Sequence, residues 1–328
     1  MTSNATDAPG GRRFIVGTLF LAAVVVAVAA AINWRINAYG VFGHPVGESL
    51  PVITNERQTK YLFSFNYIPG SFDALLVGSS IAGNLDTSKV HGMRLYNAAL
   101  SGGNITEESL IADNALRRGH LRFLVAFLNP YLVLTHGRKA GGMSPRDFWG
   151  ALGSTDLMSS YLGALAIRLG LAHQRFTAEG MQDAWETQAP PADGEGAPNP
   201  ARTPDNATPG ISRFALDPTA MEQLAELVQL ARAQGAAVVW VFAPVYSPTY
   251  NVRRLAYRDF EERIHSLARP GESILDFNDG SFAALTTHAD AFSDGVHLSN
   301  AAALDVARSL DQFLATRASA APPSPTDR

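Results

Sequence analysis

The sequence has no cysteine, no excess of basic residues, and few long uncharged apolar runs. Without cysteine the chain has no disulfide, no thiol nucleophile and no thiolate metal site. Its 26 Lys and Arg are outnumbered by 30 Asp and Glu, and this net charge of −4 lacks the basic footprint of a nucleic-acid-binding protein. We therefore expect no nucleic-acid partner. The apolar content of 46% over 328 residues is enough for a sizeable core.

One long apolar run lies near the N-terminus. It starts at Phe14, directly after Arg12 and Arg13, and carries no charge through Ile32. About 20 residues at ~1.5 Å per residue cross the ~30 Å core of a bilayer, so residues 14–33 are expected to be a single-pass transmembrane signal anchor. The arginine pair predicts a cytoplasmic segment over 1–13 and a body on the periplasmic side of the inner membrane, although Arg35 weakens this asymmetry. The alanine-rich end of the run also fits a cleaved signal peptide.

Beyond this run, short apolar segments alternate with helical ones. After a juxtamembrane segment over 34–70, strands are predicted at 73–77, 95–100, 121–128, 236–242 and 273–277, and helices at 106–118, 218–234, 252–267 and 300–316. This alternation predicts an α/β domain over 71–316, with a parallel sheet covered by helices on both faces. Residues from about 188 to 210 are rich in Pro, Gly, Asp and Asn, which predicts a flexible insertion. Residues 317–328 are expected to form a disordered tail.

A pair of serines follows the first predicted strand of the domain. Gly78-Ser79-Ser80 ends the run over 73–77, and a helix start is expected at Ile81. Ser80 is therefore placed at the carboxyl edge of the sheet, where ligands bind in open α/β folds and helix N-terminal amides favour negative charge. A serine here is also a common helix N-cap, so this block alone leaves its role open.

The next two strand ends fall at the same edge. Residues 97–103 end in Ser101-Gly102-Gly103, and glycine lets a backbone N–H approach a ligand closely. Asn129 follows the strand predicted over 121–128, so its amide could donate into the same cleft. Asn-Pro is also an ordinary turn, and that explanation stays open.

Asp294 and His297 lie three residues apart in a loop just before the last predicted helix. An aspartate can orient an imidazole, the imidazole can take a hydroxyl proton, and the hydroxyl can attack an acyl carbon. With Ser80, these two residues supply the three groups of a serine esterase. Each has an ordinary structural explanation by itself, and only their conjunction with three strand ends favours a catalytic site.

In these four blocks the chain resembles the SGNH hydrolase superfamily, also called GDSL-like, over roughly residues 70–316. The resemblance implies a flavodoxin-like three-layer α/β/α fold. It implies that Ser80 is the nucleophile, His297 the base, and Asp294 the residue that orients the base. It also implies an oxyanion hole formed by the backbone amides of Ser80 and Gly102 and by the side chain of Asn129.

The chain departs from the usual pattern at Ser79, where an aspartate is common, and around Asn129, which lacks a preceding glycine and is followed by Pro130. Gly-Ser-Ser after an N-terminal anchor resembles a membrane-tethered branch that acts on cell-envelope polymers. Members of that branch often have a multi-pass membrane acyltransferase as partner, and we expect the membrane itself, reached through the N-terminal helix, as a further partner.

The function implied by the resemblance is that of a serine esterase or O-acyltransferase with an acyl-serine intermediate. Its substrate would be an acylated polysaccharide of the cell envelope or the extracellular space, with acetyl esters expected first. No metal or organic cofactor is called for, because the histidines lack metal-ligand spacing. The alternatives are a non-catalytic SGNH-like subunit that binds glycan or scaffolds a membrane polysaccharide-modification complex, and a lipase or thioesterase.

Overall fold

Five short strands form one parallel sheet in the computed structural model, which describes residues 9–42, 55–134, 143–182, 213–293 and 296–318. The strands are β1 (Ala74–Gly78), β2 (Leu95–Asn97), β3 (Phe123–Leu128), β4 (Ala237–Phe242) and β5 (Ser273–Asp276). Their order is β2-β1-β3-β4-β5 and every pairing is parallel. This is the flavodoxin-like order, so the predicted fold class is confirmed.

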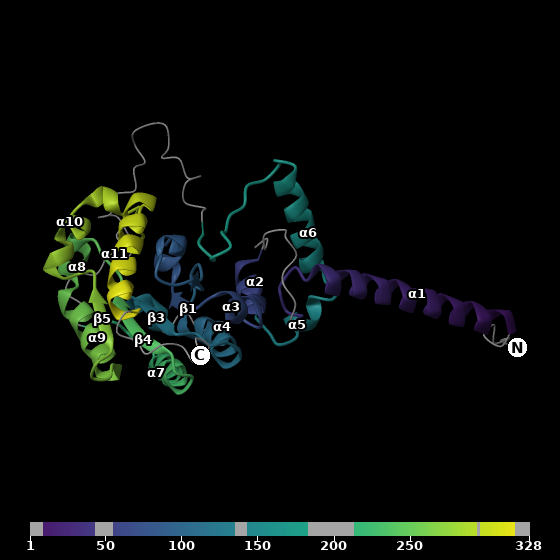
Figure 1. Ribbon diagram of the computed structural model, residues 1–328, viewed down its shortest axis with the longest axis horizontal. Helices are drawn as coiled ribbons and strands as arrows, with labels where there is room; N and C mark the ends of the chain where they lie inside the picture. The colour runs from purple at the N-terminus through teal and green to yellow at the C-terminus, as the bar shows by residue number, and fades with distance from the viewer. Residues whose placement is uncertain (1–8, 43–54, 135–142, 183–212, 294–295, 319–328) are drawn as a thin grey trace, which may run out of the picture.

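The sheet is buried on both faces, as expected for a parallel sheet whose strands are continuous apolar runs. Side chains along each strand alternate between two cores: Leu75 and Val77 face one, and Leu76 faces the other. The first core is closed by α2 (Glu56–Phe63), α3 (Tyr67–Ser71), α4 (Ile105–Arg118), α7 (Pro218–Ala233) and α9 (Arg254–Leu267). The second is closed mainly by α11 (Asn300–Ala318) and the turns η1 (Ser80–Ala82) and η2 (Thr87–Lys89). The helices therefore form two layers around the sheet (Figure 1).

The remaining elements lie outside these layers or connect them. They are α1 (Pro9–Ile36), η3 (Pro130–Val133), α5 (Asp147–Gly150), α6 (Thr155–Arg168), α8 (Ser247–Val252), η7 (Gly280–Phe282), α10 (Ala283–Thr286) and η8 (Ala289–Ala291). Helix α1 projects away from the domain (Figure 1). Over Gly11–Ile36 it has 26 residues, a mean hydropathy of 2.8 and no buried part in its most apolar window. It is long and apolar enough to cross a membrane, and a signal sequence has the same features.

The core extends upstream of residue 71, where the sequence placed the start of the domain. Helices α2 and α3 lie inside the segment 34–70 that was expected to be juxtamembrane. Leu62, Phe63 and Ile68 are fully buried in the first core, so this segment is part of the domain. The insertion expected over 188–210 and Asp294 lie outside the described residues, as does the tail beyond residue 318.

Candidate active site

Ser80 lies at the carboxyl edge of the sheet, as its position after β1 predicts. β1 ends at Gly78, Ser79 is the N-cap of η1, and Ser80 is the first residue of that turn. A Cβ atom at Gly78 would lie 3.0 Å from the carbonyl oxygen of Phe127 on β3 and 3.2 Å from the Cβ of Ala82. The glycine therefore allows the chain to pass close to β3 and Ala82 where β1 leads into η1, the turn that begins with Ser80.

His297 is brought to Ser80 across 217 residues of sequence. The Oγ of Ser80 lies 2.9 Å from the Nε2 of His297, within hydrogen-bond distance. The loop that carries His297 is closed by a bond from Ser293 N–H to the His297 carbonyl (2.8 Å). It is also tied to the segment after η1, because the side-chain amide of Asn84 donates to the carbonyl of Leu298 (3.0 Å). The candidate base is thus held near the candidate nucleophile by hydrogen bonds of neighbouring residues as well as by the contact between the two side chains.

Asp294, predicted to orient the imidazole, belongs to the residues that the structure does not describe. Its role stays a prediction.

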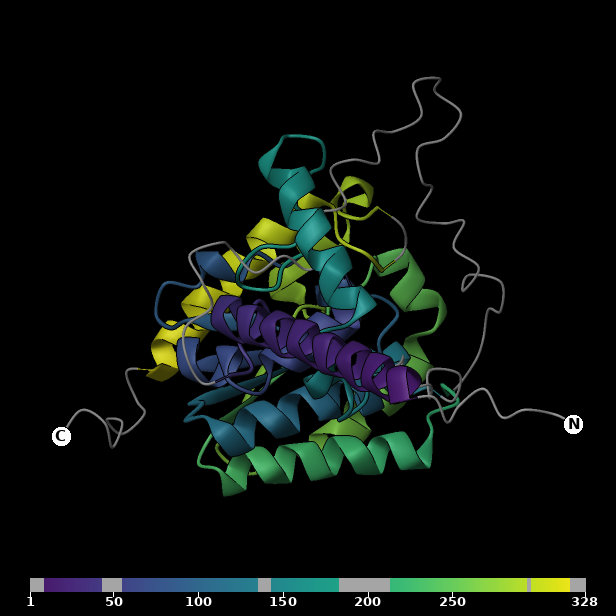
Figure 2. The ribbon, with the colours of Figure 1, turned by 90° about the vertical axis from the view of Figure 1, so that its right-hand side faces the viewer.

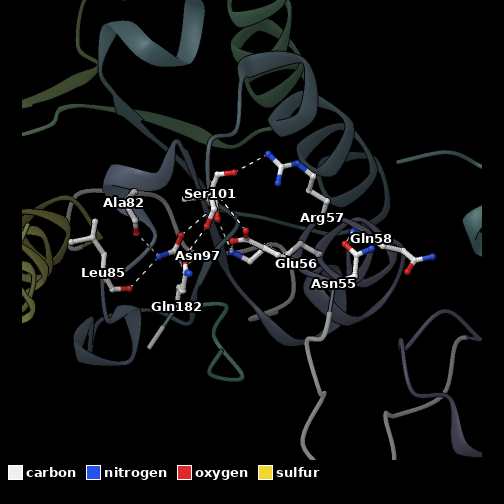
Figure 3. Close-up of polar contacts among 11 residues, drawn as sticks. Asn55, Glu56, Arg57, Gln58, Ala82, Leu85, Asn97, Ser101 and Gln182 are labelled. Carbon is white, nitrogen blue, oxygen red and sulfur yellow. Dashed lines mark hydrogen bonds and ion pairs between the residues drawn. The ribbon is translucent and has the colours of Figure 1, made fainter. Parts of the chain in front are cut away.

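Asn97, at the end of β2, ties the segments that follow β1 and β2 to one another (Figure 3). It is fully buried. Its amide nitrogen donates to the carbonyls of Ala82 (2.7 Å) and Leu85 (3.2 Å), and its Oδ1 accepts from Ala99 N–H (3.1 Å). The sequence placed Asn97 in the second block without a role. A polar residue at the end of an apolar strand was the available signal.

Gly102 lies in the loop between β2 and α4. Its φ of 60° is in the left-handed region, which glycine adopts without strain. The turn is closed by a bond from Gly103 N–H to the Leu100 carbonyl (2.9 Å), and Asn104 caps α4 by accepting from Glu107 N–H (3.2 Å). Within the described part of the chain no acceptor is found for the Gly102 N–H, which is what an oxyanion donor requires before substrate binds.

Asn129 follows β3 at the same edge and is 3% exposed. Its Nδ2 donates to the Oγ of Ser79 (2.7 Å), and its buried Oδ1 has no hydrogen-bond partner among the described residues. An amide nitrogen carries two N–H groups, so the bond to Ser79 uses one of them. Ser79, which stands where the related pattern has an aspartate, is therefore the contact residue of the predicted third oxyanion donor.

Helix α2 supplies polar side chains beneath the Gly102 loop, and sequence reasoning missed all of them. Arg57 donates to the Ser101 carbonyl (2.8 Å), and Glu56 accepts from the Ser101 N–H (3.1 Å) (Figure 3). Lys60 donates to the Ala99 carbonyl (2.6 Å). No motif marks residues 56–60 in the sequence, because their role depends on where the chain returns after β2.

Two fully buried ionisable groups lie in this region. Burial lowers the pKa of Lys60, and the nearby Glu56 carboxylate offsets only part of that effect. Burial raises the pKa of Glu108 well above its ordinary value, and Lys60 again offsets only part of it. Both carboxyl oxygens of Glu108 lack hydrogen-bond partners in the described structure, so its neutral form is favoured.

Across the described ranges, no three His, Asp or Glu side chains lie close enough together to hold a metal ion.

No protein-family model matches the chain, and no curated protein sequence does. Among solved structures, it is similar to a Streptococcus pneumonia protein provisionally named a platelet activating factor, with 13% identity, a TM-score of 0.42, and coverage of 80% of this chain and 91% of that one. It is also similar to a GDSL-like lipase from Bacteroides thetaiotaomicron, with 10% identity, a TM-score of 0.36, and coverage of 76% and 88%. Likeness at this level bears on neither activity nor substrate.

Proposed function

We propose that the protein is a serine esterase or O-acyltransferase whose nucleophile is Ser80 and whose general base is His297. The observation that carries the proposal is the 2.9 Å contact between Ser80 Oγ and His297 Nε2 at the carboxyl edge of the sheet. A serine and an imidazole at this distance are the activated pair of nucleophilic acyl transfer. The resemblance of the four sequence blocks to SGNH hydrolases supports the same assignment.

The reaction would take place in two steps. The Nε2 of His297 takes the hydroxyl proton of Ser80 as its Oγ bonds to the ester carbonyl carbon, and the carbonyl oxygen becomes an oxyanion. The C–O bond to the leaving alcohol then breaks, and the proton on His297 passes to that alcohol. An acyl-serine remains, and a second oxygen nucleophile, deprotonated by His297, releases the acyl group. Asp294 would hold the imidazole in the required tautomer.

The oxyanion would be stabilised by N–H groups already at the site. Gly102 offers a backbone N–H that has no acceptor among the described residues, Asn129 offers the second N–H of its amide, and Ser80 offers its own backbone amide. Donors fixed in place before the reaction need no reorganisation as charge develops, and one such donor is worth about 10²–10³-fold in kcat.

The acceptor decides whether the protein is an esterase or a transferase. Water would make it an esterase, and a sugar hydroxyl would make it an O-acyltransferase; both use the same site. We propose an acylated polysaccharide of the cell envelope as substrate, with the domain on the periplasmic side of the inner membrane. In helix α1, Arg12 and Arg13 directly precede the apolar part, and this position of the positive charges supports the placement. A multi-pass membrane acyltransferase is the partner that such a placement suggests.

The test is turnover of a chromogenic acetyl ester by purified full-length protein and by the variants Ser80→Ala and His297→Ala. Each variant should lose at least about 10³-fold in kcat/KM, because nucleophile and base act as a unit. Ser88→Ala is a matched control, since this serine lies on η2 and, among the described residues, its side chain bonds to Asp86. Mass spectrometry after incubation with the ester should find an acyl adduct on Ser80. Equal rates in wild type and both variants would refute the proposal.

The alternative is a non-catalytic subunit that binds glycan. The bond between Asn129 and Ser79 favours it, because that bond occupies part of the donor the reaction would use. Protein that binds acetylated polysaccharide but forms no adduct with a serine-reactive fluorophosphonate would support this alternative.

A further inference from the structure

Helix α6 has a row of exposed apolar side chains along one face. Four of them recur at spacings i, i+4, i+7 and i+11, and each is between 52% and 62% exposed: Met158, Leu162, Leu165 and Leu169. The other side of the helix packs inward, where Leu157 and Ser160 are buried. Since soluble proteins seldom expose contiguous apolar rows, this face is suited to contact with another apolar surface, such as a membrane or a protein.

The same helix is attached to the C-terminal end of α1. Tyr161 on α6 donates to the Oδ1 of Asn33 (3.0 Å), and the amide of Asn33 donates to the Leu152 carbonyl (2.6 Å). Just beyond α1, the hydroxyl of Tyr39 is hydrogen-bonded to the hydroxyl of Ser160, next to Tyr161 on α6 (2.9 Å). Helix α6 runs upward from beside the C-terminal end of α1, transverse to it (Figure 1), and a view from the α1 side shows α6 on that same side of the molecule (Figure 2).

We propose that the exposed face of α6 lies in the surface of the membrane that α1 spans. A helix that runs steeply across the end of a spanning helix lies along the bilayer plane, where an apolar row is buried at the level of the headgroups. Trp149, 68% exposed on the neighbouring α5, has the side chain preferred at that depth. The inference rests on the proposed membrane anchor, and it would hold the domain against the bilayer.

The absence of cysteine allows this to be tested with single labels on the full-length protein. Leu165→Cys carries a spin label in vesicles of phosphatidylethanolamine and phosphatidylglycerol, and its collisions with oxygen and with a water-soluble nickel chelate are compared. Leu255→Cys is the matched control, because this leucine is 65% exposed at the start of α9. We expect a severalfold higher oxygen-to-nickel ratio at residue 165 than at residue 255.

A third label at Val24→Cys, within α1, separates the two proposals. If residue 24 is in lipid while residue 165 is as accessible to nickel as residue 255, the α6 inference is wrong and the face is left for a protein partner. If residue 24 is itself accessible to nickel, the anchor proposal and the α6 inference both fail.

A different set of contacts concerns the peptide group that joins Ser101 and Gly102. Arg57 donates to the carbonyl of this peptide, and its Nε donates to Glu107 (2.8 Å), whose side chain is 1% exposed. Glu56 accepts from the preceding N–H, so both sides of Ser101 are held by α2. In a trans peptide the N–H points opposite to the carbonyl, so fixing the Ser101 oxygen also fixes the direction of the Gly102 N–H.

From these contacts we infer that Arg57 is a positioning residue for the oxyanion hole. Its guanidinium orients the Gly102 N–H and polarises it, because a peptide that accepts a charge-assisted hydrogen bond at its oxygen becomes a better donor at its nitrogen. Arg57 itself does not touch the substrate. This second inference rests on the proposed function, since it presupposes that an oxyanion forms beside Gly102.

The test compares Arg57→Met with Arg232→Met. Arg232 makes an equivalent set of contacts, to the Glu272 carboxylate (2.7 Å) and the Leu267 carbonyl (2.9 Å). Glu272 precedes β5, which β3 and β4 separate from β1, the strand that Ser80 follows. We expect Arg57→Met to lower kcat by about tenfold, less than loss of a whole oxyanion donor, with KM little changed. Affinity for an alkylboronic acid, which forms a tetrahedral adduct with the serine, should fall by the same factor.

Arg57→Lys should recover part of the loss, because it keeps a charged donor, whereas Arg232→Met should leave kcat and boronate affinity per folded molecule unchanged. The inference is overturned if Arg57→Met loses stability but keeps wild-type kcat and boronate affinity. Absence of turnover and of a Ser80 adduct in the wild type overturns the proposed function, and this inference with it.

Discussion

Arg57 and Arg232 make the same kind of contact at two ends of the sheet, and their surroundings differ in one respect. Each guanidinium binds a largely buried glutamate and a backbone carbonyl. Arg57 lies at the carboxyl ends of β1 and β2, beside the candidate site. Arg232 lies at the amino ends of β4 and β5, where Glu272 directly precedes β5.

The two regions differ in how completely their buried polar groups are paired. Glu272 accepts from Arg232, from the indole of Trp240 (2.8 Å) and from the N–H of Arg269 (2.9 Å). In the site region, by contrast, Glu108 has no hydrogen-bond partner at either oxygen, and Asn129 has none at its Oδ1, as far as the structure describes their surroundings.

An unpaired buried polar group costs stability, so a fold selected for stability alone would pair it. The amino ends of the strands meet that demand. At the carboxyl ends this pairing is incomplete, and the second N–H of Asn129 is left as a donor, which is what a site that must bind a developing negative charge requires. The comparison therefore separates residues whose loss should reduce activity from residues whose loss should reduce stability.

Among the variants that test this comparison, the largest effect is expected from Asn129→Ala, which removes a proposed oxyanion donor. We expect kcat for an acetyl ester to fall by about 10²–10³-fold. Asn278→Ala is the matched control: this asparagine follows β5 at the same edge, but its Oδ1 accepts from Val245 N–H (2.9 Å) and its Nδ2 donates to the Ala243 carbonyl (3.0 Å). It should reduce thermal stability and leave kcat unchanged. Equal kcat losses in the two variants would show that the incomplete pairing of Asn129 does not mark it as a site residue.

The core of the fold could be predicted from the sequence because it follows local rules. Apolar runs such as 121–128 predicted the strands. Acidic residues in the first turn and basic residues in the last turn predicted the helix over 106–118, and α4 runs from Ile105 to Arg118. The strand expected over 95–100 stops at Asn97 instead. Its later residues still bond to β1, through Ala98 N–H to the Leu76 carbonyl (2.9 Å) and Leu100 N–H to the Gly78 carbonyl (3.3 Å). Between them, the Ala99 N–H bonds to the side chain of Asn97 instead (3.1 Å).

The candidate site could be predicted only in part, for a related reason. Ser80 and His297 were identified because the sequence shows both their residue types and their positions, one after a strand and the other before the last helix. The structure brings the two side chains together. Arg57 and Lys60 were missed because their partners, the carbonyls of Ser101 and Ala99, are backbone groups present at every residue. Contacts between a side chain and a distant backbone carry no sequence pattern, so only the fold shows them.

The Arg232–Glu272 pair should contribute to stability without affecting the site. Arg232→Met is expected to lower the free energy of unfolding by about 2–4 kcal/mol, because it leaves a largely buried carboxylate without its cation. The two side chains are 14% and 13% exposed. Denaturant unfolding monitored by far-ultraviolet circular dichroism measures the loss. A loss no larger than that of an exposed pair, such as Arg263–Asp259, would show that the pairing at this edge is not what stabilises it.

The smallest effects distinguish the two glutamates by the sign of their pH dependence. Burial raises the pKa of Glu108 well above its ordinary 4.5, so its folded form keeps a proton that the unfolded chain loses. Its favourable contribution is therefore complete below pH 4.5 and is lost as the pH rises through the folded pKa. Glu108→Gln stays neutral throughout, so we expect it to be no less stable than wild type at low pH and increasingly more stable as the pH rises.

Glu272 should show the opposite behaviour. Burial alone would raise its pKa, but hydrogen bonds from Arg232, Arg269 and Trp240 outweigh burial and lower it. Its contribution is present above pH 4.5 and is lost as the pH falls through the folded pKa, so Glu272→Gln should be less stable than wild type at neutral pH, with the gap closing in acid. Thermal unfolding of both variants and wild type, from neutral pH down to a pH well below 4.5, measures the two gaps. The Glu108→Gln gap should close by pH 4.5 and the Glu272→Gln gap, of opposite sign, only below it, because Glu108 is buried without a hydrogen-bond partner among the described residues and Glu272 is paired. Gaps of one sign would show that pairing does not distinguish the two glutamates.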